Sequence, residues 1–318
     1  MVLPSIAIVS GLALLIWSAN KFVDGSAELA RKYSVPPLLI GIVIIGFGTS
    51  FPEMMVSAFA AYEGNSGLAL GNAYGSNIAN IALIIGVTAV IAPIAVHSDA
   101  IRREIPILLG VTGLTVALLF DGALSRIDAV VLFAVFLALI GWSVREGFRN
   151  REDSFGQEVE AHYSPPADSA GKPLFRAIAG LVVLIVSSRL LVWGAVEVAG
   201  ALGVSDLLIG LTIVAVGTSL PELASSLSAA LKKQPDLALG NILGSNLFNT
   251  LVVVGIAGII EPMIVPPEIL SRDIIVVGLA TVLLFVFCFS FRGQGQVTRP
   301  KGAILLFTYI GYNIWLIA

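Results

Sequence analysis

The sequence predicts an all-α membrane protein with ten transmembrane helices, arranged as two inverted repeats of five helices each. Three observations lead to this prediction. Of the 318 residues, 57% are hydrophobic and 12% are charged, whereas soluble domains carry about 25% charged residues. Apolar runs long enough to span a bilayer recur along the whole chain. The second half of the sequence also repeats the first at a constant offset of 169 residues.

The apolar runs give the predicted spans, since a membrane helix needs about 20 predominantly apolar residues. The first run lacks a basic flanking segment and is longer than a signal peptide, so we expect a spanning helix there and no cleaved leader. The predicted helices cover residues 5–22, 37–62, 67–93, 104–120, 126–147, 174–200, 207–231, 237–260, 272–291 and 302–318.

The internal repeat is strongest between residues 41–86 and 210–255, which align without a gap and are identical at 20 of 46 positions. The shared residues include many polar ones, which two unrelated membrane helices would not share through composition. Because each half holds five predicted helices, an odd number, the second half must enter the bilayer in the opposite sense. Inverted repeats of this kind are typical of secondary transporters, whose sites lie at the interface of the repeats.

The chain therefore divides into a first repeat (1–148), a polar linker (149–173) and a second repeat (174–318). Lys and Arg residues indicate the orientation, because cytoplasmic loops are enriched in them. The loops on the face of the linker hold 15 Lys and Arg residues, and the loops on the opposite face hold two. We expect a multi-pass protein of the cell (inner) membrane, with a cytoplasmic linker and both termini outside.

Several classes of site are disfavoured by composition. The formal net charge of −3 gives no sign of nucleic-acid binding. Cys288 is the single cysteine and cannot form an internal disulfide, and the two histidines, His97 and His162, lie in polar connecting segments. Without a Cys or His set, zinc and copper are not expected. We expect no cofactor and no obligatory protein partner.

Two glutamates stand in the middle of predicted spans, Glu53 in the second and Glu222 in the seventh. A carboxylate at the bilayer centre is costly, by roughly 2.5–3.5 kcal/mol for Asp on insertion scales. The central parts of helices two, three, seven and eight contain no Lys or Arg, and Arg189 in helix six cannot serve two symmetric sites. Each glutamate is therefore expected to face a cavity or a cation.

Repeated hydroxyl side chains surround each glutamate. Spacings of three, four and seven residues place them on the helical face of the glutamate. Pro52 and Pro221 lack the N–H that would bond the carbonyl four residues earlier, so backbone carbonyls become available in mid-membrane. The hydroxyl residues are Thr49, Ser50 and Ser57 beside Glu53, and Thr218, Ser219 and Ser226 beside Glu222.

The third and eighth predicted helices begin with repeated glycine, serine and asparagine residues. Carboxylate, hydroxyl, amide and carbonyl oxygens are the ligands that calcium prefers, and sodium takes oxygens as well. Interhelical hydrogen bonding by the asparagines and close packing at the glycines remain open as the structural alternative. The residues are Asn72, Ser76, Asn77 and Asn80, with their copies Asn241, Ser245, Asn246 and Asn249.

The motifs GTSFPE with GSNIAN, and GTSLPE with GSNLFN, resemble the two alpha-repeats of the calcium/cation antiporter superfamily, and most of all prokaryotic sodium/calcium exchangers. The resemblance covers both repeats and implies that Glu53 and Glu222 bind calcium and sodium in turn. It further implies calcium ligation by the carbonyls of Thr49 and Thr218, sodium sites at Ser50, Ser76, Ser219, Ser245 and the carbonyls of Gly46 and Ala215, and a central position for Asn80 and Asn249. Around these residues we expect a supporting set: Asn72, Asn241, Asn77, Asn246, Ser57, Ser226, Pro52 and Pro221.

This chain departs from many relatives at one position. Sodium/calcium exchangers, and especially potassium-dependent ones, often place an aspartate where Asn249 stands. We therefore expect exchange that does not require potassium, and a cavity with two formal charges. Two carboxylates balance one calcium or two sodium ions, so a third sodium ion would make the exchange electrogenic. Helices one and six are the candidates for sliding past the core during alternating access.

Other functions stay open from the sequence. The two glutamates could carry protons as the counter-cargo, which would make the chain a proton/calcium, or other divalent cation, exchanger. A cation channel would use the same oxygens, although a pore usually lies on an oligomer axis. An intramembrane hydrolase using Ser50 or Ser219 would lack a histidine or lysine base nearby, so we do not expect an enzyme.

Overall fold

The computed structural model describes residues 2–33, 41–96, 99–149, 170–202, 215–289 and 295–317, and these residues are mostly helical. Among them, six helices are long and apolar enough to cross a membrane, and a shorter apolar helix covers Glu104–Leu118. These features agree with the predicted class. Most of the predicted linker 149–173 and the starts of the helices predicted at 37 and 207 lie outside the described residues.

The first half of the chain folds into continuous helices at both ends and interrupted helices between them. Its elements are α1 (Val2–Lys32), the π-helical turn η1 (Gly41–Ile45), α3 (Gly46–Thr49), α4 (Phe51–Tyr62), α5 (Ser66–Ile78), the π-helical turn η2 (Ala79–Ile84), α6 (Ile85–Ile91), β1 (Ile94–Val96), α7 (Asp99–Leu118), β2 (Ala123–Leu124) and α8 (Arg126–Arg149).

The second half follows the same plan. From α3 to α6 and from α12 to α15, corresponding elements begin and end at positions 169 residues apart. The repeated sequence thus folds into repeated local structure. The elements are α10 (Gly171–Ala201), α12 (Ala215–Thr218), α13 (Leu220–Leu231), α14 (Pro235–Leu247), η4 (Phe248–Val253), α15 (Val254–Ile260), β3 (Met263–Ile264), η5 (Ile269–Asp273), α16 (Ile274–Cys288), β4 (Gly295–Val297) and α17 (Arg299–Ile317).

The first helix is longer than the sequence predicted. It was expected to end near residue 22, where polar residues begin, but α1 continues to Lys32. The extra turns are held on both sides: Val23 and Ser26 are fully buried, while Asp24 pairs with Lys232 and Glu28 pairs with Arg176. Asp24 and Glu28 ended the apolar run but not the helix, because each is paired with a basic residue of another segment.

The second and seventh predicted helices are interrupted where the sequence suggested one continuous helical face. Ser50 separates α3 from α4 and has φ −80° and ψ 2°, and Ser219 separates α12 from α13 with φ −90° and ψ 6°. The prolines that follow, Pro52 and Pro221, lie in the first turn of the next helix. Proline is favoured there because a first-turn N–H has no helical partner to lose.

Two small antiparallel ribbons also modify the all-α prediction. β1 pairs with β4, with Ile94 opposite Val297, and β2 pairs with β3, with Leu124 opposite Met263. Both ribbons join one half of the chain to the other. Pairing over two or three residues between distant segments leaves little pattern in the sequence, so the ribbons were not predicted.

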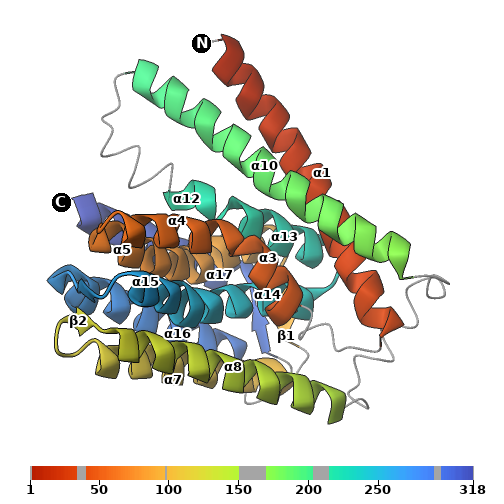
Figure 1. The fold of residues 1–318 in the computed structure, drawn as a ribbon. Coiled ribbons are helices and arrows are strands. Elements are labelled where there is room, and N and C mark those ends of the chain that lie inside the picture. Colours follow the sequence, from red (N-terminus) through yellow and green to blue (C-terminus); the bar gives the residue numbers. More distant parts are fainter. Residues whose placement is uncertain are drawn as a thin grey trace.

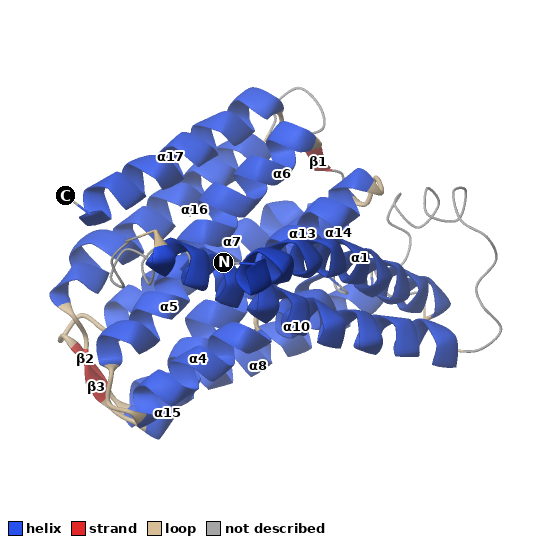
Figure 2. Cartoon of the chain, turned by 90° about the horizontal axis from the view of Figure 1, so that it is seen from above, coloured by secondary structure: helices blue, strands red, loops and turns tan. Residues whose placement is uncertain are grey.

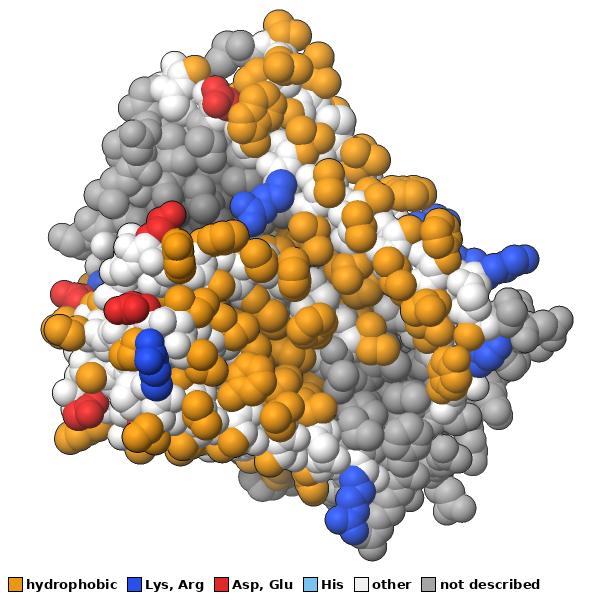
Figure 3. Space-filling view, in the orientation of Figure 1, with side chains coloured by type: hydrophobic (Ala, Val, Ile, Leu, Met, Phe, Trp, Pro, Cys, Tyr) orange, Lys and Arg blue, Asp and Glu red, His pale blue; other side chains and the backbone are white. Residues whose placement is uncertain are grey.

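The helices differ in how deeply they lie in the molecule. Of the most apolar window of each helix, 89% is buried in Pro235–Ile260 and 72% in Ser66–Ile91, against 28% in Val2–Leu29. The main hydrophobic core therefore lies around α5–α6 and α14–α15. α1 and α10 cross each other and run obliquely to the other helices (Figures 1 and 2). Hydrophobic side chains dominate the surface drawn in Figure 3, and charged ones are sparse on it, as expected of a face toward lipid.

Candidate functional site

Glu53 and Glu222 stand in the first turns of α4 and α13, directly after the two helix breaks. Neither side chain has exposed surface. The breaks at Ser50 and Ser219 place a serine of each half beside the glutamate of the other half. Ser50 Oγ donates to Glu222 Oε1 over 3.3 Å, and Ser219 Oγ donates to Glu53 Oε1 over 3.5 Å.

These reciprocal hydrogen bonds bring the two glutamates, far apart in sequence, into one site. Each carboxylate has a second oxygen, Oε2, which is buried without a hydrogen-bond partner among the described residues. Buried carboxylates normally have partners, because an unpaired buried charge is very costly. The two Oε2 atoms are therefore candidates to bind a ligand. A cation or a proton would compensate the negative charge of the carboxylates.

Thr49 connects the end of α3 to α14. Its Oγ1 lies 3.1 Å from Ile45 O, 3.1 Å from Asn241 Oδ1 and 3.4 Å from Ser245 Oγ. The counterpart Thr218 is half-buried at the end of α12. The two threonines thus occupy corresponding positions one residue before the breaks.

Asn72 and Asn241 form hydrogen bonds with the backbone carbonyls of the glutamates. Asn72 Nδ2 donates to Glu53 O over 3.0 Å and to Ser57 Oγ over 2.9 Å. Asn241 Nδ2 lies 3.3 Å from Glu222 O and 2.7 Å from Ser226 Oγ. Each asparagine therefore fixes the turn that carries the glutamate of its own half.

Four further asparagines lie in the π-helical turns of the two central helices or in the last turn before them. Asn80 Nδ2 donates to Asn246 Oδ1 over 2.9 Å, and Asn77 Nδ2 donates to Thr250 Oγ1 over 2.8 Å. Within the described part of the chain, Oδ1 of Asn77, Oδ1 of Asn80 and both polar atoms of Asn249 are buried without partners. π-helical turns inside α-helices frequently mark functional sites.

The remaining predicted residues lie on the same elements as this cluster. Ser76 and Ser245 are buried on α5 and α14. Gly46 begins α3 and Ala215 begins α12. Gly46 packs closely on α14, because a Cβ there would lie 3.1 Å from Ser245 N.

The described residues hold no group of three or more His, Cys, Asp or Glu side chains suited to a metal. A cation at this site would be held by two carboxylates together with hydroxyl and amide oxygens. Such a set suits a hard cation of the size of calcium or sodium and gives no soft ligand for zinc or copper.

Two residues of the cluster were missed from the sequence. Thr250 accepts from Asn77, and Ser225 Oγ lies 2.9 Å from Asn241 Nδ2. Their counterparts in the first half are the apolar residues Ile81 and Val56. A search for polar residues shared by the two repeats therefore did not find them. The sequence could have indicated both residues by their positions: Thr250 directly follows Asn249, and Ser225 lies three residues after Glu222.

Comparison with known proteins agrees with this geometry. The profile of the family described as sodium/calcium exchanger protein matches residues 4–145 and 172–318. The chain belongs to this family, whose members are transporters and not enzymes. The resemblance to the calcium/cation antiporter superfamily is thereby confirmed.

Individual relatives cover nearly the whole chain. The putative antiporter CaxA of Alkalimonas amylolytica is 44% identical over 319 residues, covering 99% of both chains. The inner membrane protein YrbG of Escherichia coli is 38% identical and covers 99% of this chain and 96% of its own length. A solved structure of the sodium-calcium exchanger NCX_Mj superimposes with a TM-score of 0.85 at 32% identity, covering 99% of each chain. The chain is thus a membrane-embedded cation antiporter of the calcium-exchanging type.

Proposed function

We propose that the protein exchanges sodium for calcium across the membrane by alternating access, with Glu53 and Glu222 as the carboxylates that both ions share. The observation that carries the proposal is the pair of fully buried glutamates, each with one oxygen bonded to a serine of the other half and one oxygen without a partner in the described structure. Competition of two ions for the same carboxylates couples their movements without a remote signal.

The ligand sets follow from the neighbouring oxygens. Calcium would take both glutamates and the main-chain carbonyls of Thr49 and Thr218. Sodium would use Ser50, Ser76, Ser219 and Ser245 on either side of the glutamates, with the carbonyls of Gly46 and Ala215, and Asn80 and Asn249 would face the centre. The buried hydroxyls of Ser50, Ser219 and Ser245, each facing a polar atom of the other half, support this assignment.

Charge counting predicts an electrogenic exchange that does not depend on potassium. Two carboxylates balance one calcium ion or two sodium ions, and a third sodium ion on neutral oxygens leaves the loaded site positive by one charge. Asn249 supplies a neutral amide with both polar atoms buried and unpaired in the described structure. The membrane potential would then contribute about 2.3 kcal/mol per charge per 100 mV.

We also propose the ten-span inverted topology, with both termini outside and the linker in the cytoplasm. The repeated element bounds and the two ribbons that each join one half to the other support it. In a Cys288→Ser background, a Val2→Cys label should react with an impermeant maleimide from outside intact cells. A Lys172→Cys label should react only after the membrane is opened, and the reverse pattern would overturn the orientation.

Radioactive calcium uptake into proteoliposomes tests the exchange itself. With equal pH on both sides, an outward sodium gradient alone should drive uptake, and valinomycin-set potentials should change its rate. Uptake should not require potassium on the calcium side. If calcium moves only when a pH gradient is imposed in sodium-free buffer, the protein is a proton/calcium exchanger, in which the unpaired Oε2 atoms take protons.

A further inference from the structure

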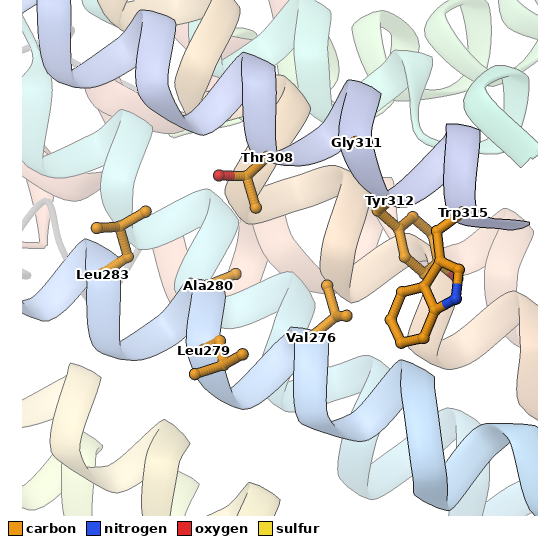
Figure 4. A pocket seen from close by; sticks show the side chains of 8 residues that line it. All are labelled: Val276, Leu279, Ala280, Leu283, Thr308, Gly311, Tyr312 and Trp315. Carbon is orange, nitrogen blue, oxygen red and sulfur yellow. The ribbon is translucent and has the colours of Figure 1, made fainter.

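A shallow groove of about 350 Å³ runs between α16 and α17, away from the glutamates. Its walls include Val276, Leu279 and Leu283 from α16, and Thr308, Gly311 and Trp315 from α17 (Figure 4). Gly311 makes part of the hollow, because a Cβ at that position would meet no heavy atom within 4 Å.

The groove opens onto a surface of apolar side chains. Leu279 is 64% exposed and Trp315 is 57% exposed, and Ile275, Val286 and Ile314 beside them are also exposed. In a membrane protein such a face lies against the hydrocarbon of the bilayer. A hollow in it must be filled by part of a lipid or by another protein, because water has no polar partners there.

A cation is linked to one end of the groove through two hydrogen bonds. Tyr312, which also lines the groove, donates its hydroxyl to Asp273 Oδ1 over 3.0 Å. Asp273 in turn accepts from Nε of Arg272 over 2.7 Å and from Nη2 over 3.3 Å. These two bonds engage Nε and Nη2 of Arg272, so the Nη1 edge of the guanidinium is left to donate to an anion.

The distance from Arg272 to the far end of the groove matches one leaflet of a bilayer. Arg272 lies in the first turn of the candidate span Ile269–Cys288, and arginines at the ends of spans extend toward the lipid headgroups. The eleven residues from Arg272 to Leu283 correspond to about 16 Å along a helix. Half of a hydrocarbon core of about 30 Å is about 15 Å. A chain anchored at Arg272 would therefore reach the bilayer midplane at the far end of the groove.

We propose that α16 and α17 form a binding site for one phospholipid molecule. One acyl chain lies in the groove against Leu279, Leu283 and Gly311, and the lipid phosphate accepts hydrogen bonds from Arg272. The phosphate suits this arginine because Asp273 is already engaged on the other edge of the guanidinium, and because arginine binds phosphate with planar, charge-assisted hydrogen bonds. The proposal does not depend on which ions the protein exchanges.

Native mass spectrometry of the detergent-released protein tests the proposal. The parent protein, purified and then mixed with phosphatidylglycerol, should retain one lipid. Gly311→Leu fills the groove and should retain at least about tenfold less. Gly278→Leu is the matched control, because Gly278 lies on α16 outside the groove wall and its Cβ would also meet nothing within 4 Å. Equal retention by the parent and Gly311→Leu would overturn the site.

The phosphate contact is tested separately with the paired change Arg272→Gln and Asp273→Asn, which removes both charges and leaves no buried charge alone. This variant should lose about tenfold in lipid retention, and unchanged retention would refute the role of Arg272. If Gly311→Leu does not fold, Trp315→Ala removes one wall of the groove at an exposed position and should lower retention similarly. A dimer in nanodiscs that dissociates in Gly311→Leu would show that a second copy of the chain fills the groove, and would also overturn the proposal.

Discussion

The crossed pair α1–α10 and the central helices around the glutamates are held by different contacts. In the crossed pair, backbones meet at glycines: a Cβ at Gly180 would lie 2.6 Å from Phe22 N, and one at Gly25 would lie 2.5 Å from Ala177 N. Gly11 and Gly194, the counterparts 169 residues away, make similar approaches. In the centre, side-chain amides, hydroxyls and carboxylates of the two halves bond to each other.

This difference bears on how each region can move. Glycine contacts interlock α1 with α10, as small residues do in membrane helix pairs, and so favour the two helices moving as one body. The central contacts are hydrogen bonds, which weaken when the distance or angle between their atoms changes. Cations can also compete for the same oxygens. We infer that the crossed pair is the better candidate for sliding and that the centre is the part which responds to ions. The following changes test each side of this comparison.

The largest effect is expected from Glu53→Gln or Glu222→Gln. In the proposed site each change removes one of the two charges that would balance a calcium ion, so calcium uptake into proteoliposomes should fall by about 100-fold or more. The variants should still fold, because a neutral amide is easier to bury than an unpaired carboxylate. Glu63→Gln is the matched control, since Glu63 is exposed just after α4 and should transport normally. Uptake near the parental rate in either central variant would refute the site.

Gly180→Leu should have the next largest effect, on the crossed pair alone. The new side chain would collide with the backbone of α1 near Phe22, and overpacking costs about 1–3 kcal/mol. Thermal unfolding in detergent should show a lower midpoint than in Gly200→Leu, where a Cβ on the same helix meets nothing within 4 Å. If both variants unfold at the same temperature, the interlocked contact is not what holds the pair.

Thr250→Val should have an intermediate effect confined to the centre. It removes the acceptor of Asn77 Nδ2, and leaving a buried donor unsatisfied costs about 1–3 kcal/mol. We expect the KM for calcium to rise several-fold, because the free Oδ1 of Asn77 loses its orientation, while the maximal rate changes less. Thr250→Ser keeps the hydroxyl and should restore the KM. Parental kinetics in the valine variant would exclude a positioning role for Thr250.

The smallest effect is expected at the contact between α1 and the end of α13. Lys232 Nζ lies 2.8 Å from Asp24 Oδ1, and the two side chains are 25% and 41% exposed. Partly exposed ion pairs contribute about 0.2–1 kcal/mol. A double-mutant cycle of Lys232→Gln and Asp24→Asn should therefore give a coupling energy in this range. A coupling above about 2 kcal/mol would show that this pair, and not the glycine contacts, anchors α1.

The helices and their repetition were predictable because they depend on local composition. Apolar runs located the helices to within a few residues in most cases, and the constant offset of 169 predicted that corresponding elements match. The length of α1 was underestimated, because Asp24 and Glu28 find partners on other elements that the local sequence does not show. Pro52 and Pro221 led to the prediction of free backbone carbonyls, but the helix breaks at Ser50 and Ser219 were not predicted.

The sequence alone was enough to identify the candidate residues of the site: two glutamates in predicted spans, each within the same repeated set of hydroxyls and amides. How these residues meet depends on the packing of the helices. Ser50 bonds to Glu222 across 172 residues, and Asn77 bonds to Thr250 across 173 residues. Helical periodicity relates residues three or four apart and contains no information on such distant pairs. The pairing of the two halves, and the groove between α16 and α17, therefore emerged only from the packing of the helices.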